Sequence, residues 1–173
     1  MNAEDLKHYI RDIPDFPKPG ILFRDVTPLL LEPRALQAAA DLVAEPFKGL
    51  GIERVLGIES RGFLLGATVA LALDAGLVLV RKEGKLPYKT HRVSYDLEYG
   101  NDTVEMHVDS VEPGQRVLIL DDLIATGGTA AAAVRLAREA GGKVVGCAFL
   151  IELTALGGAG KVAVDLFHSV LRY

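Results

Sequence analysis

The sequence predicts an α/β fold in which a mostly parallel sheet is flanked by helices. Short apolar runs that are typical of buried strands recur along the chain, at residues 54–58, 77–80, 117–120 and 143–151. The third run is followed by a loop of small residues and a helical pattern over residues 130–140, which together make half of a βαβ unit. A length of 173 residues, with 50% of them hydrophobic and 24% charged, suits one domain with a sizeable core.

The N-terminal region is expected to contain one helix and one short strand. The apolar spacing predicts an amphipathic helix over residues 3–11. Three closely spaced prolines forbid a regular helix over residues 13–20, so we expect a stiff extended loop there. The mostly apolar residues 21–25 then predict an edge strand.

Proline and glycine positions indicate where the next helices begin and end. Thr27 before Pro28 is typical of an N-cap and a first helical position, and predicts a short helical turn. A longer helix is expected from about residue 33, and Pro46 should end or kink it because a proline ring removes an intrahelical hydrogen bond. A further helix should begin at Gly62.

The second half of the chain predicts a hairpin and a closing strand. Residues 93–97 and 103–108 alternate in period two around a set of turn residues, which predicts a β-hairpin. A last strand is expected over residues 165–171. The glycine-rich residues 157–161 suggest a Walker A loop only superficially, because the first glycine and the final Ser or Thr are missing. We therefore expect a plain connection.

Composition and charge exclude several classes of function. The formal net charge of −4 argues against a surface that binds nucleic acid. The apolar residues 62–80 divide into a helix and a strand that are each too short to span a bilayer, so no membrane span is expected. No signal-peptide pattern opens the chain, and we expect a cytoplasmic protein. The single cysteine, Cys147, should be a buried thiol, and the four histidines lack the spacing of metal ligands.

Two carboxylates and a glycine-rich loop follow the predicted strand at residues 117–120. Asp121 and Asp122 come directly after this strand, at the edge where open α/β sheets bind their ligands. The next loop offers two hydroxyls, and two glycines that permit close backbone approach and φ > 0, in the order Ala125, Thr126, Gly127, Gly128 and Thr129. The free N–H groups at the start of the following helix favour an anion, most naturally a phosphate.

This segment has more than one interpretation. A hydrophobic strand that ends in two aspartates also occurs in Walker B strands and receiver-domain pockets, and a Gly-Gly turn can be only a tight connection. The complete segment is more specific, and it resembles the phosphoribosyl-pyrophosphate motif of type I phosphoribosyltransferases. The resemblance implies that residues 125–129 hold a ribose 5-phosphate. It also implies that Asp121 and Asp122 face the ribose hydroxyls.

A second anion site is predicted where the helix at Gly62 begins. Arg61 adds a forked cation that suits phosphate oxygens. An Arg-Gly pair at a turn is often only structural, but the resemblance implies that Arg61 is catalytic and that the whole loop binds pyrophosphate, through Glu59, Ser60, Arg61 and Gly62. In this family the loop often contains a non-proline cis peptide bond.

A basic loop follows the predicted strand at residues 77–80. It is either a solvated charged loop or a mobile lid over a polyanion. The sequence Arg-Lys-x-Gly-Lys-Leu-Pro at residues 81–87 is similar to that of adenine phosphoribosyltransferases. The resemblance implies that Lys82 and Lys85 contact pyrophosphate.

The predicted strand at residues 21–25 is either a plain edge strand with a surface arginine or part of a base-binding site. The spacing Phe-Pro-x-Pro-Gly-x-x-Phe-Arg-Asp at residues 16–25 resembles the N-terminal hood of adenine phosphoribosyltransferases. The resemblance implies that the base contacts are the Leu22 backbone, the Phe23 ring, Arg24 at the base edge, and Leu123.

The resemblance implies a complete activity. This is the transfer of a 5-phosphoribosyl group from phosphoribosyl pyrophosphate to adenine, which gives AMP and pyrophosphate in purine salvage. It implies one domain over residues 1–173, with a hood over about residues 1–31 and a flexible lid over about residues 82–108. It further implies a homodimer that uses Mg²⁺, carried mainly by the substrate, with Asp121 and Asp122 as candidate contacts.

Two other functions remain open from the sequence. A transferase for another purine or pyrimidine base would share the central motif but not the Leu22-Phe23-Arg24 hood. A purine-sensing regulator without catalytic activity could use the same fold, but it would need a DNA-binding appendage that we do not find in this acidic chain.

Glu98 is the carboxylate that the family pattern Ser-Tyr-x-Leu-Glu-Tyr-Gly requires at the tip of the predicted hairpin. It is either a solvated charge or a catalytic group. The chemistry favours the second interpretation, because positive charge builds on the base and the sugar as pyrophosphate departs. A carboxylate in a closed lid can stabilise that charge and manage a proton of the base.

Substitution of Glu98 by Gln tests this role. Glu98→Gln keeps the shape of the side chain and loses its ionisation, so the turnover number should fall by roughly 10²–10⁴-fold. Binding of phosphoribosyl pyrophosphate should barely change. Single-turnover AMP formation measured beside equilibrium binding separates the two effects. A variant that turns over within a few-fold of the wild type would make Glu98 a lid residue without a catalytic role.

Overall fold

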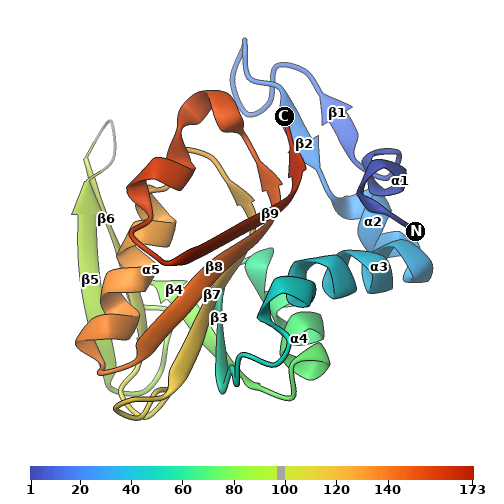
Figure 1. Ribbon diagram of the computed structural model, residues 1–173. Coiled ribbons are helices and arrows are strands. Elements are labelled where there is room, and N and C mark those ends of the chain that lie inside the picture. Colours follow the sequence, from blue (N-terminus) through green and yellow to red (C-terminus); the bar gives the residue numbers. More distant parts are fainter. Residues whose placement is uncertain (97–99) are drawn as a thin grey trace.

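A seven-stranded sheet forms the centre of the molecule (Figure 1). The computed structural model describes residues 1–96 and 100–173. The strand order is β5-β6-β4-β3-β7-β8-β9, with β3 Arg54–Ile58, β4 Gly76–Lys82, β5 Thr90–Asp96, β6 Asn101–His107, β7 Arg116–Ile124, β8 Lys143–Glu152 and β9 Leu166–Arg172. Strands β4, β3, β7, β8 and β9 are parallel to one another, and β6 runs antiparallel to both β4 and β5. The predicted mostly parallel sheet and its hairpin are confirmed.

Helices cover both faces of the sheet, as the near-continuous apolar strands require. Helices α3 (Pro33–Ala44) and α4 (Gly62–Ala72) pack on one face, against Leu118 and Leu120 of β7. Helix α5 (Gly128–Glu139) covers the other face, against Ile119 of the same strand (Figure 1). The buried Cys147 lies on the α5 face, where burial raises the pKa of its thiol to about 12. The expected buried thiol is therefore confirmed.

The N-terminal residues form a small sheet that the sequence did not predict. Helix α1 (Ala3–Lys7) is shorter than the expected helix over residues 3–11. Strand β1 (Arg11–Ile13) pairs antiparallel with β2 (Phe23–Asp25), beside the C-terminal end of the chain (Figure 1). The Nη2 atom of Arg11 donates to the Asp25 carboxylate over 2.7 Å. This long-range ion pair holds the chain extended at a position where local periodicity favoured a helix.

The start of α2 (Thr27–Leu31) also differs from the prediction. The N-cap residue is Val26 instead of Thr27. The Asp25 carboxylate accepts from the Thr27 backbone N–H over 2.9 Å and from the Thr27 hydroxyl over 2.7 Å. Asp25 thus performs the capping that we expected of Thr27. The end of α3 is as predicted, because Pro46 lies in the 3₁₀ turn η1 (Glu45–Phe47) that follows it.

Strand β7 extends further than the predicted residues 117–120. Its pairing with β3 ends at Leu120, whereas its pairing with the longer β8 continues to Ile124. Asp121 and Asp122 therefore lie inside β7 but beyond the last residue that pairs with β3, at the open carboxyl edge of the sheet. The expected connection over residues 157–161 is confirmed: it contains the 3₁₀ turn η3 (Gly158–Lys161), which follows a second turn, η2 (Thr154–Leu156). Among the described residues, no helix combines the length and the apolar character that crossing a bilayer requires.

Candidate active site

The glycine-rich loop forms the start of α5. Gly127 is the N-cap and has a φ of 81°, which L side chains rarely adopt. A Cβ at Gly127 would collide with the carbonyl oxygen of Gly158, which packs behind the loop. A Cβ at Gly128 would make only an ordinary contact, 3.5 Å from the Tyr95 ring. The need for glycine that we assigned to both positions therefore belongs to Gly127.

The carboxylate pair meets the start of α4 directly. A Cβ at Gly62 would lie 2.8 Å from Oδ1 of Asp121, so only glycine lets this helix start approach β7 so closely. The same Oδ1 accepts from the backbone N–H of Asp122 over 2.8 Å. Burial, together with the Asp122 carboxylate, raises the pKa of Asp121 well above its ordinary value.

Asp122 is paired with the cation of the second loop. Its side chain is buried, and its Oδ2 lies 2.6 Å from Nε of Arg61. The Arg61 N–H does not point at this oxygen, so the contact is an ion pair without hydrogen-bond alignment. Asp122 therefore positions the Arg61 guanidinium at the start of α4, where anions are favoured.

Glu59 fixes the loop that precedes Arg61. Its carboxylate accepts from Nε of Arg81 over 2.9 Å and from the backbone N–H of Lys82 over 3.0 Å. The peptide bond between Glu59 and Ser60 is cis, as is often found in the family that the loop resembles. The contacts of Glu59 with Arg81 and Lys82 connect the end of β4 to the predicted pyrophosphate loop.

Three adjacent hollows of about 130, 290 and 280 Å³ lie along this edge of the sheet, and Asp121 lines all of them. The first is formed by the loop at residues 125–129. The second is lined by the loop at residues 59–61 together with Leu123, which also lines the first. The third lies under the hairpin and is lined by Glu59, Lys82, Tyr95, Asp102 and Thr129, among others. The structure thus brings the two predicted anion sites to either side of one carboxylate.

The two predicted lysines differ in position. Nζ of Lys82 lies 2.9 Å from Oδ2 of Asp102, and this hydrogen bond raises the pKa of Lys82. Lys85 is exposed, and of the residues described it is not among those that line the three hollows. The loop that carries Lys85 is anchored by the buried Glu105, which accepts from the backbone N–H groups of Gly84 and Leu86.

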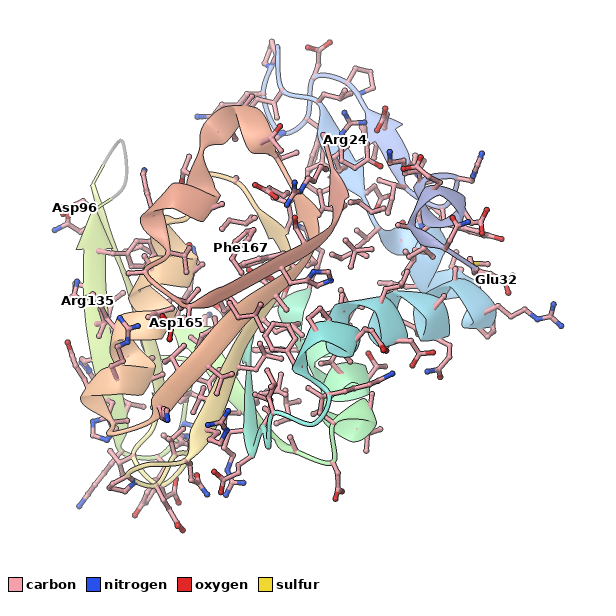
Figure 2. All side chains as sticks on the ribbon, in the orientation of Figure 1. Arg24, Glu32, Asp96, Arg135, Asp165 and Phe167 are labelled. Atoms are coloured by element: carbon pink, nitrogen blue, oxygen red, sulfur yellow. The ribbon has the colours of Figure 1, made fainter. Side chains whose placement is uncertain are left out.

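The hood reaches the site through Phe23. The Phe23 ring centroid lies 5.0 Å from the Arg61 guanidinium and 5.1 Å from the Phe16 ring. Arg24, in β2 (Figure 2), pairs with Asp12 of β1 and lies 4.0 Å from the ring centroid of Tyr173, which follows β9. The structure therefore brings Phe23 to the site and holds Arg24 within the hood. The half-exposed Leu22 precedes them in the chain.

Four residues of the site were not singled out from the sequence: Arg81, Tyr95, Asp102 and Gly158. Tyr95 stands in the same family pattern as Glu98, which was a signal that we did not use. The hydroxyl of Tyr95 lies 3.0 Å from Oγ1 of Thr129, which connects the hairpin to the phosphate loop. Glu98 itself lies outside the described residues, so its predicted role stays a prediction.

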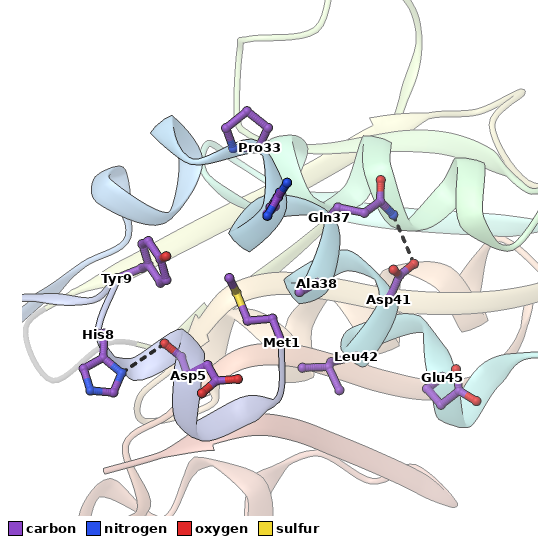
Figure 3. Close-up of a pocket in the computed structure, with 11 residues that line it drawn as sticks. Met1, Asp5, His8, Tyr9, Pro33, Gln37, Ala38, Asp41, Leu42 and Glu45 are labelled. Atoms are coloured by element: carbon purple, nitrogen blue, oxygen red, sulfur yellow. Dashed lines mark hydrogen bonds between the residues drawn. The ribbon is translucent and has the colours of Figure 1, made fainter.

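A larger hollow of about 1000 Å³ lies elsewhere, between α1 and α3 (Figure 3). Its lining includes the pair Gln37 and Asp41, joined by a 3.1 Å hydrogen bond, and His8, whose ring nitrogen lies 3.2 Å from the Asp5 carbonyl oxygen. None of the predicted site residues lines it. The candidate site is therefore the smaller set of hollows at the carboxyl edge of the sheet.

Comparison with known proteins agrees with this geometry. The family model described as the phosphoribosyl transferase domain matches residues 26–165. An adenine phosphoribosyltransferase from Rhodopirellula baltica is 53% identical over 98% of this chain and 82% of its own length. One from Syntrophotalea carbinolica is 50% identical over 98% and 99% of the two chains. The chain belongs to the adenine phosphoribosyltransferase family.

Solved structures of the family share the whole fold. The adenine phosphoribosyltransferase from Rhodothermus marinus superposes with a TM-score of 0.94 at 57% identity, covering 99% of this chain and 98% of that one. The Saccharomyces cerevisiae adenine phosphoribosyltransferase, solved with an imino-altritol 1,6-bisphosphate and adenine, gives a TM-score of 0.92 at 39% identity over 98% of each chain. The type I phosphoribosyltransferase fold that the sequence predicted is confirmed.

The two loop glycines should respond differently to substitution. Gly127→Ala places a Cβ against Gly158 at an unfavourable φ, so affinity for ribose 5-phosphate should fall by about tenfold or more. Gly128→Ala is the matched control and should stay within about twofold, because its Cβ meets an ordinary contact and its N–H is kept. Isothermal titration with ribose 5-phosphate measures both. Equal losses in the two variants would contradict the assignment to Gly127.

Proposed function

We propose that this protein transfers the 5-phosphoribosyl group from phosphoribosyl pyrophosphate to adenine, giving AMP and pyrophosphate in purine salvage. The observation that carries the proposal is the contact between Gly62 and Asp121. It sets two helix N-termini, those of α4 and α5, on either side of one carboxylate. A sugar with phosphate at one end and pyrophosphate at the other has the matching distribution of charge.

The substrate is assigned to the site by charge and hydrogen-bonding capacity. The loop at residues 125–129 takes the 5-phosphate on the free N–H groups at the start of α5. Asp121 and Asp122 accept from the ribose hydroxyls. The pyrophosphate lies at residues 59–62, where the start of α4 and the Arg61 guanidinium favour an anion, and within reach of the exposed Lys82 side chain. Lys85 would join it only after moving from its present position.

The base is assigned to the space between the hood and β7. Phe23 faces Arg61, and Leu123 lines the hollow that contains Arg61. An apolar ring and an aliphatic side chain provide the surfaces against which a purine stacks. The Saccharomyces cerevisiae relative was solved with a bisphosphate and adenine together, which supports the same pair of ligands for this chain.

Transfer requires stabilisation of charge more than covalent chemistry by the protein. As pyrophosphate departs, Arg61 and Lys82 stabilise the negative charge that accumulates on it. Positive charge builds on the sugar and the base at the same time, and the carboxylates of Asp122 and Glu98 are proposed to balance it. The hairpin covers the α5 loop through Tyr95, which limits the access of water to the activated sugar.

The carboxylate pair suits a magnesium ion that the substrate carries. Mg²⁺ keeps several waters and commonly uses one or two carboxylates together with substrate phosphates. Asp121 and Asp122 supply that number, and Asp122 Oδ2 is a buried oxygen without an aligned donor among the described residues. Among residues 1–96 and 100–173, no group of three or more His, Cys, Asp or Glu side chains is placed to hold a metal ion. Bound magnesium would neutralise charge on the departing pyrophosphate.

The proposal also covers the environment and the assembly of the protein. We propose a cytoplasmic homodimer, as the family resemblance implies. The molecular mass in solution tests the proposed homodimer directly. A monomeric mass would contradict it.

One assay separates the proposed activity from the alternatives. Protein, Mg²⁺ and phosphoribosyl pyrophosphate are mixed with adenine, hypoxanthine, xanthine or orotate, and nucleotide formation is followed. AMP should form with adenine, at a kcat/KM roughly 10²-fold or more above that for the other bases. Turnover of another base in preference to adenine would reassign the hood. Binding of phosphoribosyl pyrophosphate without turnover of any base would indicate a regulator.

The two aspartates should respond unequally to neutral substitution. Asp122→Asn removes the counter-ion of Arg61 from a buried position and should lower kcat/KM by about 10–150-fold, equivalent to ~1.5–3 kcal/mol. Asp121→Asn should cost less than about tenfold, because a carboxyl with a raised pKa loses less charge and Asn still accepts from the Asp122 N–H. Steady-state kinetics on both variants, with circular dichroism to confirm folding, measure the difference. A larger loss at Asp121 would reverse the assignment.

A further inference from the structure

A continuous chain of polar contacts joins the two proposed phosphate sites. Oγ1 of Thr129 lies 3.0 Å from the Tyr95 hydroxyl, which donates to Oδ2 of Asp102 over 3.3 Å. The same Oδ2 lies 2.9 Å from Nζ of Lys82. All four residues line one hollow of about 280 Å³. One end of this chain is in the α5 loop, and the other is the lysine assigned to pyrophosphate.

We propose that Tyr95 and Asp102 are positioning residues that transmit the occupancy of the phosphate loop to Lys82. The inference rests on the proposed function, which assigns Thr129 to the 5-phosphate and Lys82 to the pyrophosphate. It adds a thermodynamic coupling between these sites and names the two residues that carry it.

The direction of the coupling follows from counting protons. A tyrosine or threonine hydroxyl has one proton to donate. Without a ligand, Tyr95 donates to Asp102, and Thr129 is free to donate to the Tyr95 oxygen. A phosphate in the loop accepts the Thr129 proton, so the Thr129 oxygen no longer donates to Tyr95 and instead competes with Asp102 for the single Tyr95 proton. The hydrogen bond from Tyr95 to Asp102 is thereby weakened, and Asp102 holds the Lys82 ammonium more strongly.

The consequence is a lower affinity for pyrophosphate while the loop at residues 125–129 holds a phosphate. Asp102 and pyrophosphate are both anions that compete for the Lys82 ammonium. Lys82 therefore binds pyrophosphate only as far as its ion pair with Asp102 weakens. The Tyr95 ring lies over Gly128, so the hydroxyl stays beside the loop that it senses. Removal of the hydroxyl alone should therefore break the coupling without uncovering the loop.

The test compares pyrophosphate affinity with and without ribose 5-phosphate, a pair that fills both sites and cannot react to form product. Isothermal titration of magnesium pyrophosphate is run at zero and saturating ribose 5-phosphate, and the ratio of the two dissociation constants is the coupling factor. Repulsion between the two anions contributes equally to every variant. In the wild type, the factor should exceed that of Tyr95→Phe by about threefold or more, the effect of one modest hydrogen bond.

Two further variants sharpen the result. Asp102→Asn should bind pyrophosphate more tightly in the absence of ribose 5-phosphate and should show the same reduced coupling factor as Tyr95→Phe. Tyr88→Phe is the matched control, since Tyr88 is an exposed tyrosine of the loop before β5 and should keep the wild-type factor. If the wild type and Tyr95→Phe have equal factors, the coupling is absent and the proposal is overturned, while the proposed function stands. If the wild type binds neither ligand, the proposed function fails as well.

Discussion

The close approach of α4 to β7 is the constraint on which the site depends. The helix start at Gly62 lies against the Asp121 carboxylate at a distance that leaves no room for a Cβ. Any larger residue would push the second anion site away from the first, and the separation between them would no longer match one substrate. The same contact puts Asp121 in a position to line all three hollows. The absence of a Cβ at Gly62 thus allows the second proposed anion site to lie against the carboxylate beside the first.

The parallel sheet makes this approach possible. Strand β7 is longer than β3 at its carboxyl end, so its last residues extend beyond the end of that neighbouring strand. The start of α4 occupies the space above the end of β3, and that of α5 follows β7 directly. Both helix N-termini therefore face the same carboxyl edge, where their dipoles add to the potential that attracts an anion.

Parts of the site that are local in the sequence could be predicted from it, and parts that depend on strand pairing could not. The loops at residues 59–62 and 125–129 carry their chemistry within a few consecutive residues. The contact between Lys82 and Asp102 instead depends on the antiparallel register of β4 and β6, in which Lys82 lies opposite Val104. Gly158 could not be predicted either, because nothing in the neighbouring sequence shows that it packs behind Gly127.

Three cations at or beside the proposed pyrophosphate loop are each held by a carboxylate: Arg61 by Asp122, Arg81 by Glu59, and Lys82 by Asp102. Such pairing keeps the cations in place before a ligand arrives, so less side-chain entropy is lost on binding. It also means that a polyanion must compete with the protein's own carboxylates for them. The competition is weakest where the carboxylate has other partners, as Glu59 has in the Lys82 N–H, and strongest for Asp122, which is buried beside Arg61. If pyrophosphate binds here as proposed, its affinity depends on the exchange of these ion pairs. In the proposed reaction, pyrophosphate must be released after each turnover. Carboxylates that pair again with the cations favour this release.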